Sequence, residues 1–275
     1  MSKTLIRGLG LIEEVDLHGP LTLTELARRL GMHITIASRT VSACEDAGWL
    51  TRVDGKITVG PRSALLGVAS PLTETVRRVE PLVRAISGIC GAATAATGLI
   101  GGDVMILASA GALAAELPAD LSSRSPIHAM AAGHAIAVQL SAPQLDAILP
   151  LEPFPSAQQV IESLGGWAPM RAYLQTHDTS APPGGAIPQT RDALDAKLDA
   201  IRSEGFARDY GELHTSVNCI AAPWPGLSLP ASLACFATRE LIESNRDLIE
   251  ACLRVATTPG ASAQDVIRAA AKPLA

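Results

Sequence analysis

The first sixty residues place apolar and polar side chains with the spacing of short amphipathic helices. Apolar residues recur every three or four positions over residues 5–15, and the pattern stops at the His-Gly-Pro sequence of residues 18–20. Thr22 and Glu25 then have the T-x-x-E spacing of a capping box, in which each residue satisfies a free amide at the helix start. The pattern predicts a second helix over residues 23–30.

A turn at Gly31 separates this helix from a third, predicted over residues 34–47. Its inward positions are apolar and its opposite face is polar. The inward residues are Ala37, Val41 and Cys44, and the outward residues are Thr35, Ser38, Arg39 and Ser42.

Gly48 ends the third helix and is followed by two short strand-like runs, WLTRV and KITVG. They flank Asp54-Gly55, a dipeptide that strongly favours a tight hairpin turn. Residues 21–47 alone are equally compatible with a helical hairpin inside a larger core. A capped helix, a glycine turn, a polar-faced helix and a hairpin in this order favour a winged helix-turn-helix.

The remainder of the chain has a different pattern of apolar and polar residues. Residues 61–84 predict a linker helix, kinked or broken at Pro71. From Ile89 onward, short apolar runs alternate with amphipathic segments such as SPIHAMAAGHAIAVQL, which predicts an α+β domain with a mainly antiparallel sheet. Further predicted elements are a loop-rich stretch over 150–190, a helix over 190–204, two or three strands over 206–238 and a helix over 241–256.

Length and charge fit this division. With 275 residues the chain is long enough for two domains, and 48% hydrophobic residues with 18% charged residues indicate a globular protein. The net charge is −5, but residues 1–67 carry eight Lys or Arg and seven Asp or Glu, a net of +1. The rest therefore carries −6, so the N-terminal segment is the expected docking place for an anionic partner.

The cysteines and the N-terminus indicate a cytoplasmic protein. Five cysteines are widely spaced without a CxxC motif, which is typical of buried, reduced thiols. Acidic residues interrupt the N-terminal apolar run that a signal peptide requires, and residues 85–102 are too rich in Gly, Ala and Thr for a membrane span. We expect four parts: a DNA-binding domain (1–62), a linker helix (63–84), an effector domain (85–258) and a poorly ordered tail (259–275).

The sequence resembles the IclR family of bacterial transcriptional regulators over most of its length. The resemblance is carried by LTLTELARRLGM, TIASRTVSACEDAGWLTR, SPIHAMAAGHA and IRSEGFARDYGELHTSVNCIAAP. It implies a winged helix-turn-helix joined by a linker helix to a GAF-like effector domain, in a protein that assembles as a homodimer or homotetramer. The implied partners are double-stranded operator DNA and a small-molecule effector, with no cofactor and no membrane.

The resemblance places Thr35, Ser38, Arg39 and Ser42 toward the major groove, where Arg grips guanine and hydroxyls hold phosphate. Arg28, Arg52 and Lys56 are better placed for contacts to the DNA backbone, with solvated surface charge as the alternative. The chain departs from the family at His33 and Ile34, where many members have Pro and a basic residue.

The implied effector pocket is formed by small residues after a histidine, an acidic strand residue, a cysteine and a later strand. These positions fall on Ala131, Ala132, Gly133, Asp209, Cys219, Cys235, Ala237 and Thr238. Where small-acid sensors of the family carry two serines, this chain reads ACFAT, which implies a more apolar pocket and a carboxylic or aromatic effector. The stretch over 153–188 is longer than usual, and its Trp167, Met170 and Tyr173 fit either a lid or a satellite core.

Three other functions are suggested by parts of the sequence. Cys219 with Asp209, Glu212 and His214 could form a thiol enzyme, but no catalytic motif accompanies them, and we expect no enzyme. His128, His134, His214 and Cys219 lack metal-ligand spacing; we expect no metal, with His128 in the core and His134 at the surface. The third alternative is a regulator whose second domain serves oligomerisation or protein contact without sensing a ligand. Repressor and activator remain equally compatible with the sequence.

Overall fold

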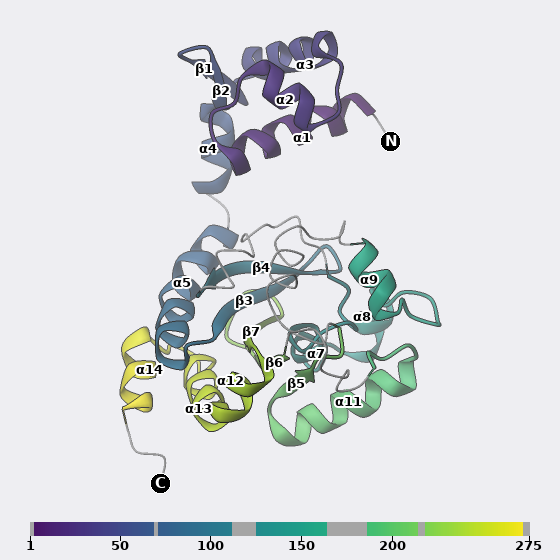
Figure 1. Ribbon diagram of the computed structural model, residues 1–275, viewed down its shortest axis with the longest axis vertical. Helices are drawn as coiled ribbons and strands as arrows, with labels where there is room; N and C mark the ends of the chain where they lie inside the picture. Colours follow the sequence, from purple (N-terminus) through teal and green to yellow (C-terminus); the bar gives the residue numbers. More distant parts are fainter. Residues whose placement is uncertain (1–2, 69–70, 112–124, 164–185, 214–217, 272–275) are drawn as a thin grey trace. The chain divides into compact units, whose positions relative to one another are not determined.

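The computed structural model describes residues 3–68, 71–111, 125–163, 186–213 and 218–271 (Figure 1). The chain divides into two compact units, residues 1–74 and 75–275. Trp167, Met170, Tyr173 and His214 lie outside the described residues.

The first unit has the element order expected for a winged helix. Its elements are α1 (Lys3–His18), α2 (Leu23–Arg29), α3 (Ile34–Asp46), β1 (Leu50–Val53), β2 (Lys56–Val59) and α4 (Pro61–Val68). The apolar faces of the helices and the hairpin share one core, formed by Leu11, Val15, Leu21, Leu26, Val41, Leu50 and Ile57. The helices predicted from spacing therefore exist because each buries its apolar side in this cluster.

The turns of this unit follow the predicted chemistry. Thr22 and Glu25 form the capping box at the start of α2, and Gly31 adopts a positive φ of 59°. Asp54 (φ 50°) and Gly55 (φ 77°) make the antiparallel hairpin turn between β1 and β2. Both φ values are positive, as the favoured two-residue hairpin turn requires.

The second unit is an α+β domain around one antiparallel sheet with the order β4-β3-β7-β6-β5. Its strands are β3 (Ala93–Ile100), β4 (Asp103–Ala110), β5 (Ala207–Tyr210), β6 (Asn218–Pro223) and β7 (Ala231–Ala237). Its described helices are α5 (Pro71–Cys90), α7 (Ala131–Ala137), α8 (Ala142–Asp146), α9 (Ala157–Ser163), α11 (Arg191–Glu204), α12 (Arg239–Ser244), α13 (Arg246–Ala256) and α14 (Ala263–Ala270).

Helices cover both faces of this sheet (Figure 1). On one face α7 packs on β5, β6 and β7, and α11 packs on α7. On the other face α12 and α13 pack on β6 and β7. Strand residues alternate between the two faces, so the register decides which side chains can share a site.

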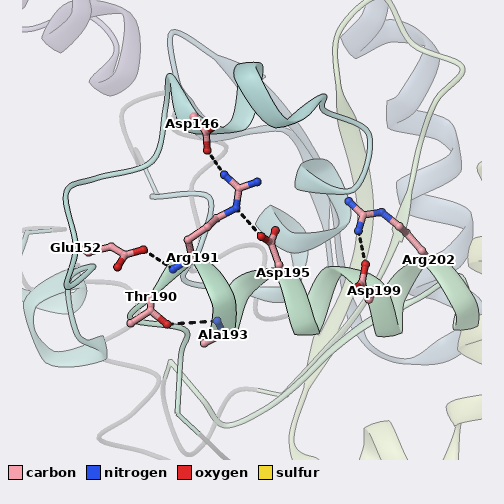
Figure 2. A network of polar contacts seen from close by, with 8 residues as sticks. All are labelled: Asp146, Glu152, Thr190, Arg191, Ala193, Asp195, Asp199 and Arg202. Atoms are coloured by element: carbon pink, nitrogen blue, oxygen red, sulfur yellow. Dashed lines mark hydrogen bonds and ion pairs between the residues drawn. The ribbon is translucent and has the colours of Figure 1, made fainter.

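Figure 2 shows how α11 is fixed to its surroundings. The Arg191 guanidinium pairs with Asp146 and, at 2.9 Å, with Asp195, while its backbone amide donates to Glu152 at 2.6 Å. Thr190 caps the helix by accepting from the amide of Ala193. This network joins α11 to α8 and to the segment that follows α8.

The structure corrects three predictions. Within the tail predicted over 259–275, residues Ala263–Ala270 form α14, which begins at a Ser262–Asp265 capping box and buries Val266. The helix predicted over 241–256 is two helices, α12 and α13, separated at Asn245, whose side chain donates to the Cys90 carbonyl at 3.1 Å. The predicted amphipathic helix around residue 133 is α7, which is buried on all sides because the sheet and α11 both cover it.

The segment predicted as a linker helix belongs to two helices, α4 and α5. One helix ends at Val68 and the next begins at Pro71, where the break was predicted. Residues 75–84 of α5 belong to the second unit, where Val79, Leu82 and Val83 are buried. They are therefore part of a domain core.

Candidate DNA-binding and effector sites

The exposed face of α3 carries the predicted base-reading residues. Ala37 and Val41 are buried, which leaves Thr35, Arg39 and Ser42 on the solvent side of the helix. These three residues follow an i, i+4, i+7 spacing and so share one face, while Ser38 is half-buried beside them. The face presents two hydroxyls and one guanidinium, which suits hydrogen bonding to a polar groove.

The cations of the first unit differ in their pairing. Arg29 is bonded to Glu14 at 2.9 Å, and Arg52 on β1 is bonded to Glu45 of α3 at 3.2 Å. Arg28, Arg39 and Lys56 are exposed and make no ion pair with any residue that the structure describes. Their charge is therefore available to an anionic partner, whereas that of Arg52 is partly neutralised by Glu45.

His33, noted as a departure from the family, caps α3. Its Nδ1 atom accepts from the backbone amide of Thr35 at 3.3 Å. In the neutral ring the proton then resides on Nε2. The sequence pattern had not predicted this role, because imidazole is not among the usual N-cap groups.

In the second unit, the sheet register brings Asp209, Cys219 and Phe236 into one row. Asp209 on β5 pairs with Cys219 on β6, which pairs with Phe236 on β7. Side chains at paired positions point to the same face. Cys219 and Phe236 belong to the apolar cluster that includes Ala131 and Ala132 of α7, so this row faces α7.

Asp209 has an unusual environment for a carboxylate. Burial is the main cause that raises the pKa of Asp209 to about 7. The backbone amide of Glu212 donates to Asp209 Oδ1 at 2.6 Å, which opposes that shift. Glu212 itself is ion-paired with Lys197 of α11. A buried carboxylate that titrates near neutrality is typical of a functional position, although structural networks also produce it.

The three small residues of α7 are all buried. Ala131, Ala132 and Gly133 form its first turn, and no side chain caps the helix. A Cβ atom at Gly133 would lie 2.3 Å from the carbonyl oxygen of Ile127. Glycine is thus required here by close packing of two backbone segments, in addition to any role in ligand approach.

Three predicted effector residues lie elsewhere. Cys235 pairs with Ile220 and Thr94, so its side chain faces the opposite side of the sheet from Cys219. Its thiol lies 3.5 Å from the Thr94 hydroxyl, and its pKa is raised to about 12, chiefly by burial. Ala237 shares that face by alternation, and Thr238 is the N-cap of α12. The structure does not bring these residues together with Asp209 and Cys219.

Two histidines occupy the core. His128 was predicted there, and its Nε2 atom lies 3.1 Å from the Pro155 carbonyl. His134 was predicted at the surface but is 1% exposed, with Nε2 donating to the His128 carbonyl at 2.8 Å. Burial lowers the pKa of His134 to about 3. The described residues contain no group of three His, Cys, Asp or Glu side chains that could hold a metal ion.

Cys219 is a poor candidate nucleophile. Burial, followed by the nearby Asp209 charge, raises its thiol pKa well above the ordinary value. A catalytic cysteine needs the opposite shift, because the thiolate is the reactive form.

Several residues of this region were not found by sequence reasoning. Ser232 on β7 donates to the Ala132 carbonyl at 2.9 Å and lies 2.7 Å from the Thr97 hydroxyl, tying α7 to the sheet. Lys197 comes near Asp209, and Phe236 pairs with Cys219, only in the folded chain, since each pair is distant in sequence. Because Cys219 pairs with Phe236, strand alternation places Phe236 and not Cys235 on the same face as Cys219. This assignment requires the pairing of β6 with β7, which the sequence alone does not give.

Comparison with known proteins identifies the fold. Neither a scan of protein-family models nor a search of curated proteins gave a match. Among solved structures, an IclR homolog from Microbacterium hydrocarbonoxydans complexed with 4-hydroxybenzoate is 19% identical, with 98% of this chain and 99% of that chain covered and a TM-score of 0.59. An IclR transcriptional regulator from Alicyclobacillus acidocaldarius is 15% identical, with coverage of 94% and 97% and a TM-score of 0.57. IclR from Thermotoga maritima is 15% identical, with coverage of 98% and 99% and a TM-score of 0.55.

The chain therefore has the fold of the IclR transcriptional regulators over nearly its whole length. At these identities the similarity establishes architecture, and function must be argued from the sites. Within the described ranges, every helix is too short or too polar to cross a membrane.

Proposed function

We propose that the chain is a ligand-responsive transcriptional regulator of the IclR type that binds double-stranded operator DNA as a homo-oligomer. The observation that carries this proposal is the exposed α3 face with Thr35, Arg39 and Ser42, next to a two-stranded wing. A recognition helix of this kind enters the major groove, and a dimer places two such helices on a pseudo-palindromic site.

The phosphate backbone supplies most of the affinity in such a complex. Arg28 and Lys56 are exposed and free of ion pairs among the described residues, which suits phosphate contacts. Arg52 is the weaker candidate because Glu45 holds it. Arg39 on the α3 face is the natural candidate for reading guanine, since its fork of donors matches the O6 and N7 acceptors.

Binding is tested by fluorescence anisotropy of the full chain on labelled DNA from the region upstream of its own coding sequence, against excess unrelated DNA. We expect binding that survives the competitor and weakens steeply with salt. Equal loss of binding to any competitor would contradict the proposal for that DNA. Selection from a random duplex library would then search for a distant operator.

For the effector we propose a small carboxylic or aromatic acid bound near Ala131, Ala132, Asp209 and Cys219. Support comes from the polar and titratable groups that converge there, Asp209, Glu212 and Lys197, beside the ring of Phe236. The IclR homolog from Microbacterium hydrocarbonoxydans holds 4-hydroxybenzoate, an acid of this class. Binding would act by favouring one arrangement of the two DNA-binding units over another.

The buried state of these residues also supports the second candidate, a domain that serves oligomerisation or protein contact without an effector. Thermal unfolding with and without 4-hydroxybenzoate and a panel of related acids separates the two. A ligand that binds the folded state must raise the unfolding temperature in a concentration-dependent way. Asp209→Ala is expected to remove that rise while leaving DNA affinity unchanged.

A further inference from the structure

Two large apolar residues of α3, Ile34 and Ile36, are exposed to solvent. Ile36 is 41% exposed and, unlike Val41 of the same helix, lies outside the apolar core of this unit. It is the third residue of the helix, within the N-terminal turns that approach base edges in helix-turn-helix proteins. Apolar area held in water is a source of binding free energy when a partner covers it.

The direction of this side chain follows from helix geometry. Successive side chains turn by about 100° around the axis, so Ile36 lies about 60° from Arg39. Ile34 is equally exposed, at 42%, but lies about 140° from Arg39 by the same rule. Ile36 therefore shares the side of α3 that Arg39 and Ala43 occupy, and Ile34 does not.

We propose that Ile36 contacts the C5-methyl group of a thymine next to the base pair that Arg39 reads, and so contributes to operator specificity. This inference rests on the proposed DNA binding by α3. The thymine methyl is the apolar group that base pairs present in the major groove, and aliphatic side chains recognise it by contact.

Charge favours DNA over a protein as the occupant of this face. Arg39, three residues further along α3, carries a positive charge without an ion pair among the described residues, and Arg28 and Lys56 do the same elsewhere on this unit. DNA offers phosphates that can pair with these cations and thymine methyl groups in the major groove that can contact the isoleucine.

The test removes only the methyl group. A duplex is selected by the full-length protein from a random library, and each thymine of the selected site is then replaced singly by deoxyuridine. Wild-type protein should lose about fourfold in affinity at one or two positions, the effect of one methyl-sized group left unburied. In Ile36→Ala this loss should disappear, so that thymine and uracil duplexes bind alike.

Ile34→Ala is the matched control, since it removes the same side chain at the same exposure on another side of α3. It should keep the fourfold difference. A selected site that binds tightly but shows no uracil effect would overturn the role of Ile36 while the regulator proposal stands. A uracil effect that persists in Ile36→Ala would also overturn it. Failure to select any competitor-resistant site would overturn DNA binding, and this contact with it.

Discussion

Asp209 and Cys219 are directly paired across β5 and β6, and both side chains are buried on the face of the sheet that α7 covers. Burial raises the pKa of both groups, and the charge of an ionised Asp209 raises the pKa of the Cys219 thiol further. The pair is therefore most stable as a neutral acid and a thiol. An arriving ligand carboxylate would find a proton donor near neutrality, which an ordinary aspartate does not offer.

The first prediction concerns Asp209→Asn. The pKa of Asp209 is raised from 3.8 to about 7, so the folded state binds the proton more tightly than the unfolded chain. This contribution to stability is fully present below about pH 3.8 and is lost as the pH rises to about 7. Urea unfolding at pH 8 should show Asp209→Asn more stable than wild type by about 1 to 4 kcal/mol, with the gap narrowing toward pH 5. A gap independent of pH would contradict the buried, titrating carboxyl.

His134 should have the opposite pH dependence. Its pKa is lowered from 6.5 to about 3, so its neutral form stabilises the fold above pH 6.5 and that contribution is lost as the pH falls. At pH 5 this costs about 2 kcal/mol. His134→Gln keeps a donor for the His128 carbonyl but does not titrate, and relative to wild type it should gain that amount between pH 7 and pH 5. If the unfolding free energies of the two proteins depended on pH in the same way, the pKa of His134 would not be lowered by folding.

Gly133→Ala tests the close packing of α7 on the preceding segment. The added Cβ would lie 2.3 Å from the Ile127 carbonyl oxygen. Relieving this clash requires the backbone of one of the two segments to move, because neither contacting atom belongs to a flexible side chain. We expect a loss of about 3 kcal/mol or more in unfolding free energy. Gly88→Ala is the control, since Gly88 lies in α5 with nothing within 4 Å of the new Cβ, and it should gain about 0.5 to 1 kcal/mol. Similar effects of the two substitutions would contradict this packing.

Lys56→Ala tests the phosphate contacts of the wing. Neutralising one phosphate contact should lower the slope of log affinity against log salt by about one and weaken all sequences alike. Arg29→Ala is the control, because Arg29 is bonded to Glu14 and is not among the predicted contacts. An unchanged slope in Lys56→Ala would remove the wing lysine from the interface.

The DNA-binding unit was predictable from the sequence because its determinants are local. The Thr22–Glu25 capping box, Gly31 and the Asp54-Gly55 turn each act within a few residues, and the structure contains all three as expected. Helix α14 follows the same local rule, since Ser262 and Asp265 have the spacing of a capping box.

The effector region was less predictable because its determinants are distant in sequence. Cys235 and Phe236 are neighbours in the chain, yet the pairing of β7 with β6 places only Phe236 with Cys219. His134 was misjudged because its helix carries small residues on every side, and only the packing of the sheet and α11 around α7 shows that it is buried. The type of a residue does not show which face of a sheet its side chain occupies, because moving the strand register by one position reverses the face.

The most direct measurement is the affinity of wild type and Arg39→Ala for the same labelled promoter duplex, in excess unrelated DNA and at two salt concentrations. Wild type should bind in the presence of competitor, and Arg39→Ala should lose about 1 to 3 kcal/mol for that duplex while binding unrelated DNA almost as well as wild type. Circular dichroism should show the variant folded, because Arg39 is exposed and makes no ion pair with the described residues. Equal affinity of the two proteins for a specifically bound duplex would show that α3 does not read the operator through Arg39.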